Sequence, residues 1–169
     1  MSDRLAQLLG VVSLAAADRF RRAVEEPLGR GGAHSAALVH LDAHPGESVQ
    51  GLARVVGVSQ PAAVKIADRL AADGLVERRP GADRRTVALH LTAEGHAAVA
   101  GVLSRRASEL SALLSVLAPA EREALEPLLE KLVAALADDR PRALNVCRLC
   151  DRDVCCGGNT GCPMAHTCR

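Results

Sequence analysis

Two serines and a glycine divide residues 48–73 in a way that limits the possible folds more than any other feature of the chain. Ser48 and Ser59 each stand just before a segment of periodic apolar residues, where a hydroxyl can cap the N-terminus of a helix. Gly57 lies between the two segments and can take the left-handed backbone that a tight turn needs. The pattern therefore predicts two short helices joined by a turn, with the second helix at 60–73, which is the layout of a helix-turn-helix.

The predicted helix at 60–73 has two chemically different faces. The residues on its inward face are apolar at helical spacing: Ala63, Ile66, Ala67 and Leu70. The residues predicted to point outward are Gln60, Ala62, Lys65 and Arg69. A helix of this kind enters the major groove of DNA with its early residues against the bases. There glutamine can pair with adenine, alanine can contact a thymine methyl group, and lysine can reach guanine or a phosphate, while the later arginine would hold a phosphate.

An arginine-rich β-hairpin is predicted directly after this helix. Residues 75–79 and 86–91 have strand-like composition and are joined by turn-forming residues. The hairpin arginines are Arg78, Arg79, Arg84 and Arg85. Arg84 and Arg85 are the candidates for a narrow minor groove, whose negative potential favours arginine. Which of the two enters the groove stays open, as does the alternative that Arg85 only pairs with Asp83 at the tip of the hairpin.

Together the helix-turn-helix and the hairpin resemble the MarR family of transcriptional regulators, which have a winged helix-turn-helix. The resemblance covers residues 2–138 and is carried by three segments: 58–70, 73–78 and 83–92. In that family an Asp-x-Arg motif, matched here by Asp83 and Arg85, sends the arginine into the minor groove, and its aspartate steadies a neighbouring arginine. The resemblance implies a homodimer whose first and last helices intertwine, holding two winged domains over a near-palindromic site in double-stranded DNA. It also implies a small-molecule effector bound between the dimer layer and the winged domain.

The sequence thus predicts a mainly α fold with a small β-hairpin wing, in which a winged helix-turn-helix is carried on a helical dimerisation layer. Four parts are expected: an N-terminal dimerisation helix in 1–32, the DNA-binding domain in 33–92, C-terminal dimerisation helices in 93–140 and a cysteine-rich tail in 141–169. Long apolar stripes in the first and third parts support the dimer, although packing within one subunit is an alternative for the first helix. Pro127 is expected to kink the last of these helices.

Charge and hydropathy bear on where in the cell the protein is found and on whether it binds DNA or a membrane. The net charge is +1, so attraction to DNA must come from a local patch rather than from the whole chain. Between residues 60 and 90, 6 basic residues outnumber 4 acidic ones. The chain has no secretion signal and no apolar run of membrane-spanning length, so a cytoplasmic protein without a membrane partner is expected. The predicted function is a sequence-specific DNA-binding transcriptional regulator acting as a repressor.

All 6 cysteines lie in the tail, between Cys147 and Cys168. In a reducing compartment such a cluster points to metal or redox chemistry before structural disulfides. A closed tetrahedral zinc site needs four ligands, and the candidates are Cys147, Cys150, Cys155 and Cys162. Cys156, His166 and Cys168 would then be spare.

Three other interpretations of the tail remain open: an iron–sulfur cluster, a thiol switch in which neighbouring cysteines exchange partners, and an unstructured tail with incidental cysteines. His40 and His44 share a helical face at a spacing that two metal ligands can use, but no third ligand is fixed by the sequence, so capping or surface histidines are expected instead.

Functions of other classes have less support. The chain has no nucleophile elbow, P-loop or dinucleotide fingerprint, so it is predicted not to be an enzyme. A thiol oxidoreductase built on the tail cysteines is one alternative, and a protein-interaction module that uses the winged fold is another. Salt-dependent binding to duplex DNA would separate these alternatives from the main prediction.

Overall fold

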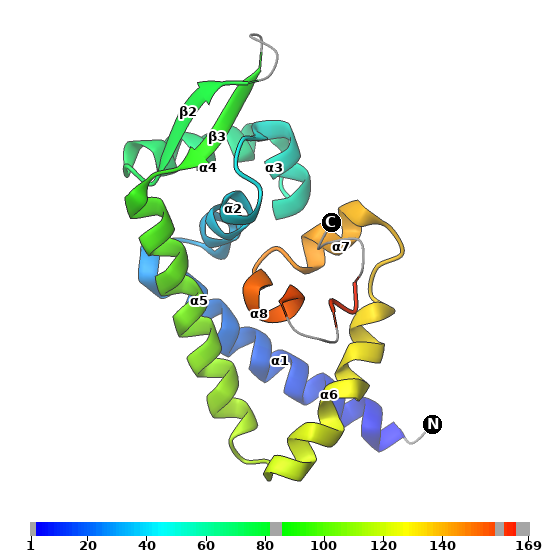
Figure 1. Ribbon diagram of the computed structural model, residues 1–169. Helices are drawn as coiled ribbons and strands as arrows, with labels where there is room; N and C mark the ends of the chain where they lie inside the picture. The colour runs from blue at the N-terminus through cyan, green and yellow to red at the C-terminus, as the bar shows by residue number, and fades with distance from the viewer. Residues whose placement is uncertain (1–2, 82–85, 158–160, 165–169) are drawn as a thin grey trace.

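The computed structural model describes residues 3–81, 86–157 and 161–164 and shows a winged helix-turn-helix at one end of three long helices (Figure 1). The helices are α1 (Asp3–Glu25), α2 (Gly32–Ala43), α3 (Val49–Val56), α4 (Gln60–Ala72), α5 (Ala93–Leu114), α6 (Pro119–Ala134), α7 (Arg140–Val146) and α8 (Arg152–Cys156), with a 3-10 turn at Glu26–Leu28. The strands are β1 (Glu47–Ser48), β2 (Val76–Pro80) and β3 (Val87–Leu91). The predicted fold class, mainly α with a small β wing, is confirmed.

The residues that punctuate the helix-turn-helix act as the sequence predicts. The Ser48 hydroxyl accepts a hydrogen bond from the Gly51 N–H at 3.0 Å and so caps α3. The Ser59 hydroxyl caps α4 in the same way, accepting from Ala62 N–H at 3.4 Å. Between the two helices Gly57 has φ 76, a left-handed conformation that costs glycine little. These three residues fix where α3 begins, where it ends and where α4 begins.

The wing is the outer part of a three-stranded antiparallel sheet in the order β1-β3-β2. The two long strands pair from Val76 opposite Leu91 to Pro80 opposite Val87. The short strand β1, which the sequence did not predict, pairs with the inner edge of β3. Thr92 joins the wing to α5, because its hydroxyl accepts from the Gly95 N–H at 3.0 Å and donates to the Gly74 carbonyl at 2.6 Å. The hairpin is therefore held rigidly on the body of the domain.

An aliphatic core lies between α2, α3, α4 and the sheet. Its largest fully buried side chains include Leu38, Leu41, Leu52, Leu70 and Leu89. The four apolar residues predicted on the inner face of the recognition helix, Ala63, Ile66, Ala67 and Leu70, are all buried. Because this face is fully used by the core, the opposite face of α4 is held at the surface.

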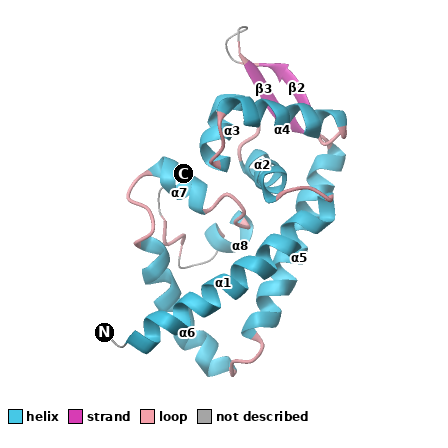
Figure 2. Cartoon of the chain, turned by 180° about the vertical axis from the view of Figure 1, so that it is seen from behind, coloured by secondary structure: helices cyan, strands magenta, loops and turns pink. Residues whose placement is uncertain are grey.

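Helices α1, α5 and α6 extend away from the winged part, with α1 packed along α5 (Figures 1 and 2). No residue of α6 is buried, and the helix continues through Pro127 without a break. The apolar side chains of α1 and α6 with about half or more of their surface exposed are Leu5, Leu8, Leu9, Val11, Val12, Leu14, Leu128 and Leu132. These stripes are not covered by the described part of the same chain.

The tail folds back against the winged part instead of extending from α6 (Figure 1). Its helices α7 and α8 are short, and each begins at an aspartate cap, Asp139 and Asp151. Ala143 and Leu149 are buried, and Leu149 joins the main core. No described helix is long and apolar enough to cross a membrane. The tail is thus a packed part of the fold and not a detached segment.

Candidate nucleic-acid interface

The outer face of α4 carries the residues predicted to contact DNA. Gln60, Lys65 and Arg69 are exposed, and Ala62 is half-buried. All four lie on a helix whose first turn is free at the surface, beside the β2–β3 hairpin (Figures 1 and 2). A helix and a hairpin side by side can contact adjacent major and minor grooves.

Ion pairs determine which cations of this face are available to a ligand. Arg69 Nε lies 3.4 Å from Asp73, which also holds Arg30 at 2.8 Å. Arg78 pairs with Asp68 at 2.6 Å. In the part of the chain that the structure describes, Lys65 makes no ion pair. Lys65 is therefore the recognition-helix cation that can approach a phosphate without first giving up an acidic partner.

Arg30 is a residue that the sequence analysis missed. It lies in the loop before α2, 43 positions from Asp73, and its Nε donates to the Asp73 carboxylate at 3.0 Å. No local pattern signals a pair this distant in the sequence. The contact fixes the C-terminal end of α4 against the loop that precedes α2.

The described part of the wing presents two exposed arginines, Arg78 and Arg79, and the second pairs with Glu77. The hairpin is closed by a hydrogen bond from Gly81 N–H to the Thr86 carbonyl at 2.9 Å. Asp83, Arg84 and Arg85 lie outside the described residues, so their roles in the minor groove stay predictions.

A second candidate site lies in the tail, where the four cysteines chosen from their spacing lie near one another. Cys147, Cys150, Cys155 and Cys162 are half-buried free thiols. All four line one cavity, between α5, α6 and the tail. Cys156 is disulfide-bonded, and His166 and Cys168 lie outside the described residues. Among the described residues, no three candidate ligands already surround a single point at metal-binding geometry.

Burial raises the pKa of three of these thiols. Burial, followed by the neighbouring Cys150, raises the pKa of Cys155 to about 12. Burial also raises the pKa of Cys147 and of Cys150. Thiols with a raised pKa are poor nucleophiles at neutral pH. These three thiols therefore do not have the low pKa that a thiol oxidoreductase needs.

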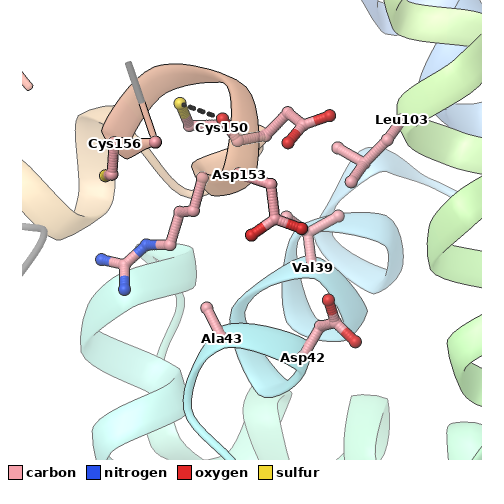
Figure 3. Close-up of a pocket in the computed structure, with 10 residues that line it drawn as sticks. Val39, Asp42, Ala43, Leu103, Cys150, Asp153 and Cys156 are labelled. Carbon is pink, nitrogen blue, oxygen red and sulfur yellow. Dashed lines mark hydrogen bonds between the residues drawn. The ribbon is translucent and has the colours of Figure 1, made fainter. Parts of the chain in front are cut away.

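A cavity of about 500 Å³ lies beside this cluster, between α2, α5 and α8 (Figure 3). Cys150 lines it from the tail, with its Sγ 3.5 Å from the Asp151 carbonyl oxygen, and Val39 and Leu103 line it from the body. The cavity shows that the tail cysteines lie against the domain and not at its outer edge.

His40 and His44 lie side by side at the C-terminal end of α2, with ring centroids 4.5 Å apart and ring planes tilted by 42°. His40 is a core residue, 5% exposed, which corrects the expectation of a surface histidine. Burial lowers the pKa of His40 and lowers that of His44 to about 4. A carboxylate oxygen of Glu47 lies 3.5 Å from His40. The pair is therefore neutral at physiological pH, with His40 in the core and His44 half-buried beside it.

The chain is similar in sequence to a family of known proteins and to two curated relatives. The model of the MarR family matches residues 28–86. The chain is 36% identical over 103 residues to the transcriptional repressor MprA of Escherichia coli strain K12, covering 59% of this chain and 58% of that protein, and it matches MprA of Escherichia coli O157:H7 equally well. The match thus spans less than two thirds of the curated relatives.

Solved structures extend the similarity over 76–80% of this chain. YusO from Bacillus subtilis has a TM-score of 0.68 and 28% identity, with 80% of this chain and 99% of that chain covered. Wild-type MarR from Escherichia coli, in its apo form, has a TM-score of 0.63 and 26% identity, with 76% and 96% covered. A Staphylococcus aureus MepR mutant bound to an oligodeoxyribonucleotide shares the fold, with a TM-score of 0.61, 22% identity, and 79% and 98% covered.

Proposed function

Because the chain is similar to the MarR family model over residues 28–86 and to a transcriptional repressor over 103 residues, we propose that it is a MarR-family, sequence-specific DNA-binding transcriptional regulator that acts as a repressor. The observation that carries the proposal is the exposed polar face of α4 beside the β2–β3 hairpin, on a core that fully occupies the other face of the helix. The similarity to a transcriptional repressor and to a regulator solved on an oligodeoxyribonucleotide supports the same function.

In this proposal α4 enters the major groove with its N-terminal turn against the bases. Gln60 and Ala62 read base edges, because an amide matches adenine and a methyl group matches thymine. Lys65 and Arg69 bind phosphates, or guanine in the case of Lys65. The wing follows the flanking minor groove, where Arg84 or Arg85 inserts and Asp83 orients the tip.

The regulator acts as a homodimer. The exposed stripes on α1 and α6 are the support for this part of the proposal, since contiguous apolar surface of this size marks an interaction face in a soluble protein. Two copies related by a twofold axis would present two recognition helices to half-sites about 34 Å apart along the duplex. The operator is therefore a pseudo-palindrome.

Selection from a pool of genomic fragments with the full chain, followed by affinity measurements on the selected duplex, tests the proposal. We expect Gln60→Ala to change the preference at one base position in each half-site and leave the others unchanged. Arg85→Ala should weaken binding to all sequences by a similar factor, because a minor-groove arginine contributes mainly through charge. An unchanged base preference and an unchanged affinity in both variants would remove this assignment.

A small-molecule effector is the remaining part of the proposal. A cavity of about 660 Å³ lies between α5, α6 and the tail, within the range of small-molecule sites. Its apolar side is formed by Leu125, Leu129 and Val133 of α6, and Phe20 lines it from α1. A ligand bound there would contact both the dimerisation layer and the tail, and we expect it to change the affinity for the selected duplex.

A further inference from the structure

The backbone of the tail turns so that thiols from four positions converge. The Cys150 N–H donates to the Cys147 carbonyl at 2.8 Å, which closes the Cys-x-x-Cys segment into a tight turn. The Cys155 N–H donates to the Asp151 carbonyl at 3.0 Å, which places Cys155 on the first turns of α8. Cys162, from the segment that follows α8, lines the same cavity as the other three cysteines. The four residues are spread over 16 positions of the sequence.

All four of these cysteines line one cavity, between α5, α6 and the tail. A tetrahedral zinc site takes four ligands at Zn–S bonds of about 2.3 Å, with neighbouring sulfurs about 3.8 Å apart. The four free thiols that line the cavity match that number. An iron–sulfur cluster would spread the same four thiolates around several iron and sulfide atoms.

We propose that Cys147, Cys150, Cys155 and Cys162 bind one thiophilic divalent cation, of the zinc class, and that this ion holds the tail against the winged domain. Binding requires the side chains to rotate onto the ion. The contacts that they leave are weak ones: Cys147 Sγ with Met164 Sδ at 3.6 Å, and Cys150 Sγ with the Asp151 carbonyl at 3.5 Å. Cys156, which is disulfide-bonded, stays outside the site.

The tail connects the proposed ion to the helix-turn-helix through α7, which packs against α3. The Asn145 side-chain amide donates to the Val55 carbonyl, in the last turn of α3, at 2.7 Å. It also lies against Gly57 in the turn before α4, where an added Cβ would come within 2.9 Å of its nitrogen. An ion bound to the four cysteines would therefore stabilise the packing of α7 against α3 of the helix-turn-helix. This regulatory part rests on the proposed DNA-binding function.

Titration of the full chain with Co²⁺, followed by displacement with Zn²⁺, tests the site without using DNA. We expect one ion per chain and the intense thiolate-to-cobalt absorption of a tetrahedral sulfur site. Cys155→Ser should weaken the affinity by about 100-fold or more, beyond the 10–100-fold typical for residues that only support a ligand. Cys156→Ser, the neighbouring cysteine on the same helix, is the matched control and should bind normally. Circular dichroism of both variants should show the helices intact.

Three outcomes would overturn the site: no thiolate-to-cobalt absorption, an equal loss in the two variants, or a brown protein with several iron atoms per chain. The coupling has a separate readout, amide hydrogen exchange in α3 with and without a chelator. Chelation should speed exchange near Val55, and Asn145→Ala should show the faster exchange even with the ion bound. If chelation removes the ion and exchange in α3 does not change, the coupling is wrong. If the chain binds the ion but not duplex DNA, the proposed function fails while the site stands.

Discussion

Replacing Lys65 with alanine should make DNA binding less sensitive to salt, by an amount that the structure allows us to calculate. Lys65 is exposed on α4 and has no ion-pair partner among the described residues, so in the complex it displaces counterions from a phosphate. A dimer loses two such contacts. Each contact contributes about −0.9 to the slope of log K against log salt, so the slope should become shallower by about 1.8. Between 50 and 200 mM salt, the wild type should then lose about 12-fold more affinity than the variant.

Fluorescence anisotropy with the selected duplex over this salt range measures the slope. Lys131→Ala is the matched control, because it removes the same charge from an exposed position on α6, away from the recognition helix. Its slope should equal that of the wild type. Equal slopes for Lys65→Ala and the wild type, or the same change in both variants, would refute the docking of α4 in the major groove.

Three further predictions concern stability and assembly. Leu70→Ala, on the buried face of α4, should lower the free energy of unfolding by about 2–5 kcal/mol in urea titrations. Val64→Ala, on the exposed face of the same helix, should lower it by less than about 1 kcal/mol, and similar losses in the two variants would mean that α4 does not bury the predicted face. Leu8→Glu, on the exposed stripe of α1, should convert a dimer to monomers in sedimentation experiments, and a dimer that persists would contradict the proposed interface. His44 has its pKa lowered from 6.5 to about 4, so the unfolded state binds more protons below pH 6.5. The contribution of His44 to the free energy of unfolding should therefore be complete above pH 6.5 and be lost as the pH drops towards 4. His44→Gln should reduce this loss. An unchanged pH dependence in the variant would contradict a lowered pKa at His44.

The helix-turn-helix was predictable because its boundaries are set by local chemistry. A serine hydroxyl can cap a helix only at its N-terminus, and a glycine with positive φ marks the turn, so Ser48, Gly57 and Ser59 fix the segment whatever surrounds it. The apolar spacing of α4 then determines which face is buried. These signals depend on neighbours only a few residues apart, which a sequence displays directly.

Short elements that depend on distant partners were not predictable. The strand β1 has two residues and exists because Glu47 and Ser48 lie opposite Leu89 and Ala88 of β3. Helices α7 and α8 have 7 and 5 residues, too few to show an apolar period. Their aspartate caps, one of which is followed by Pro141, are the signals that could have indicated them.

The two candidate sites differ in how much the sequence revealed. The four cysteines chosen from their spacing are free thiols in the structure, and Cys156, which was set apart, is disulfide-bonded. Spacing did not reveal Met164 beside Cys147 or Asn145 against α3, because both contacts arise from the way the tail folds back. In the same way, a stripe on α1 has the same sequence pattern whether it packs within a subunit or between two subunits. The structure leaves the stripe exposed in the single chain, which supports the proposed dimer.

Chemical probing of the selected duplex with the full chain bound tests the central claim most directly, because it reports which groove each part of the protein covers. We predict protection of major-groove base edges in two segments centred about one helical turn apart, roughly 10 base pairs, with minor-groove protection on their outer sides. A bound duplex whose major-groove edges remain fully reactive would contradict the assignment of α4 as the helix that reads the sequence.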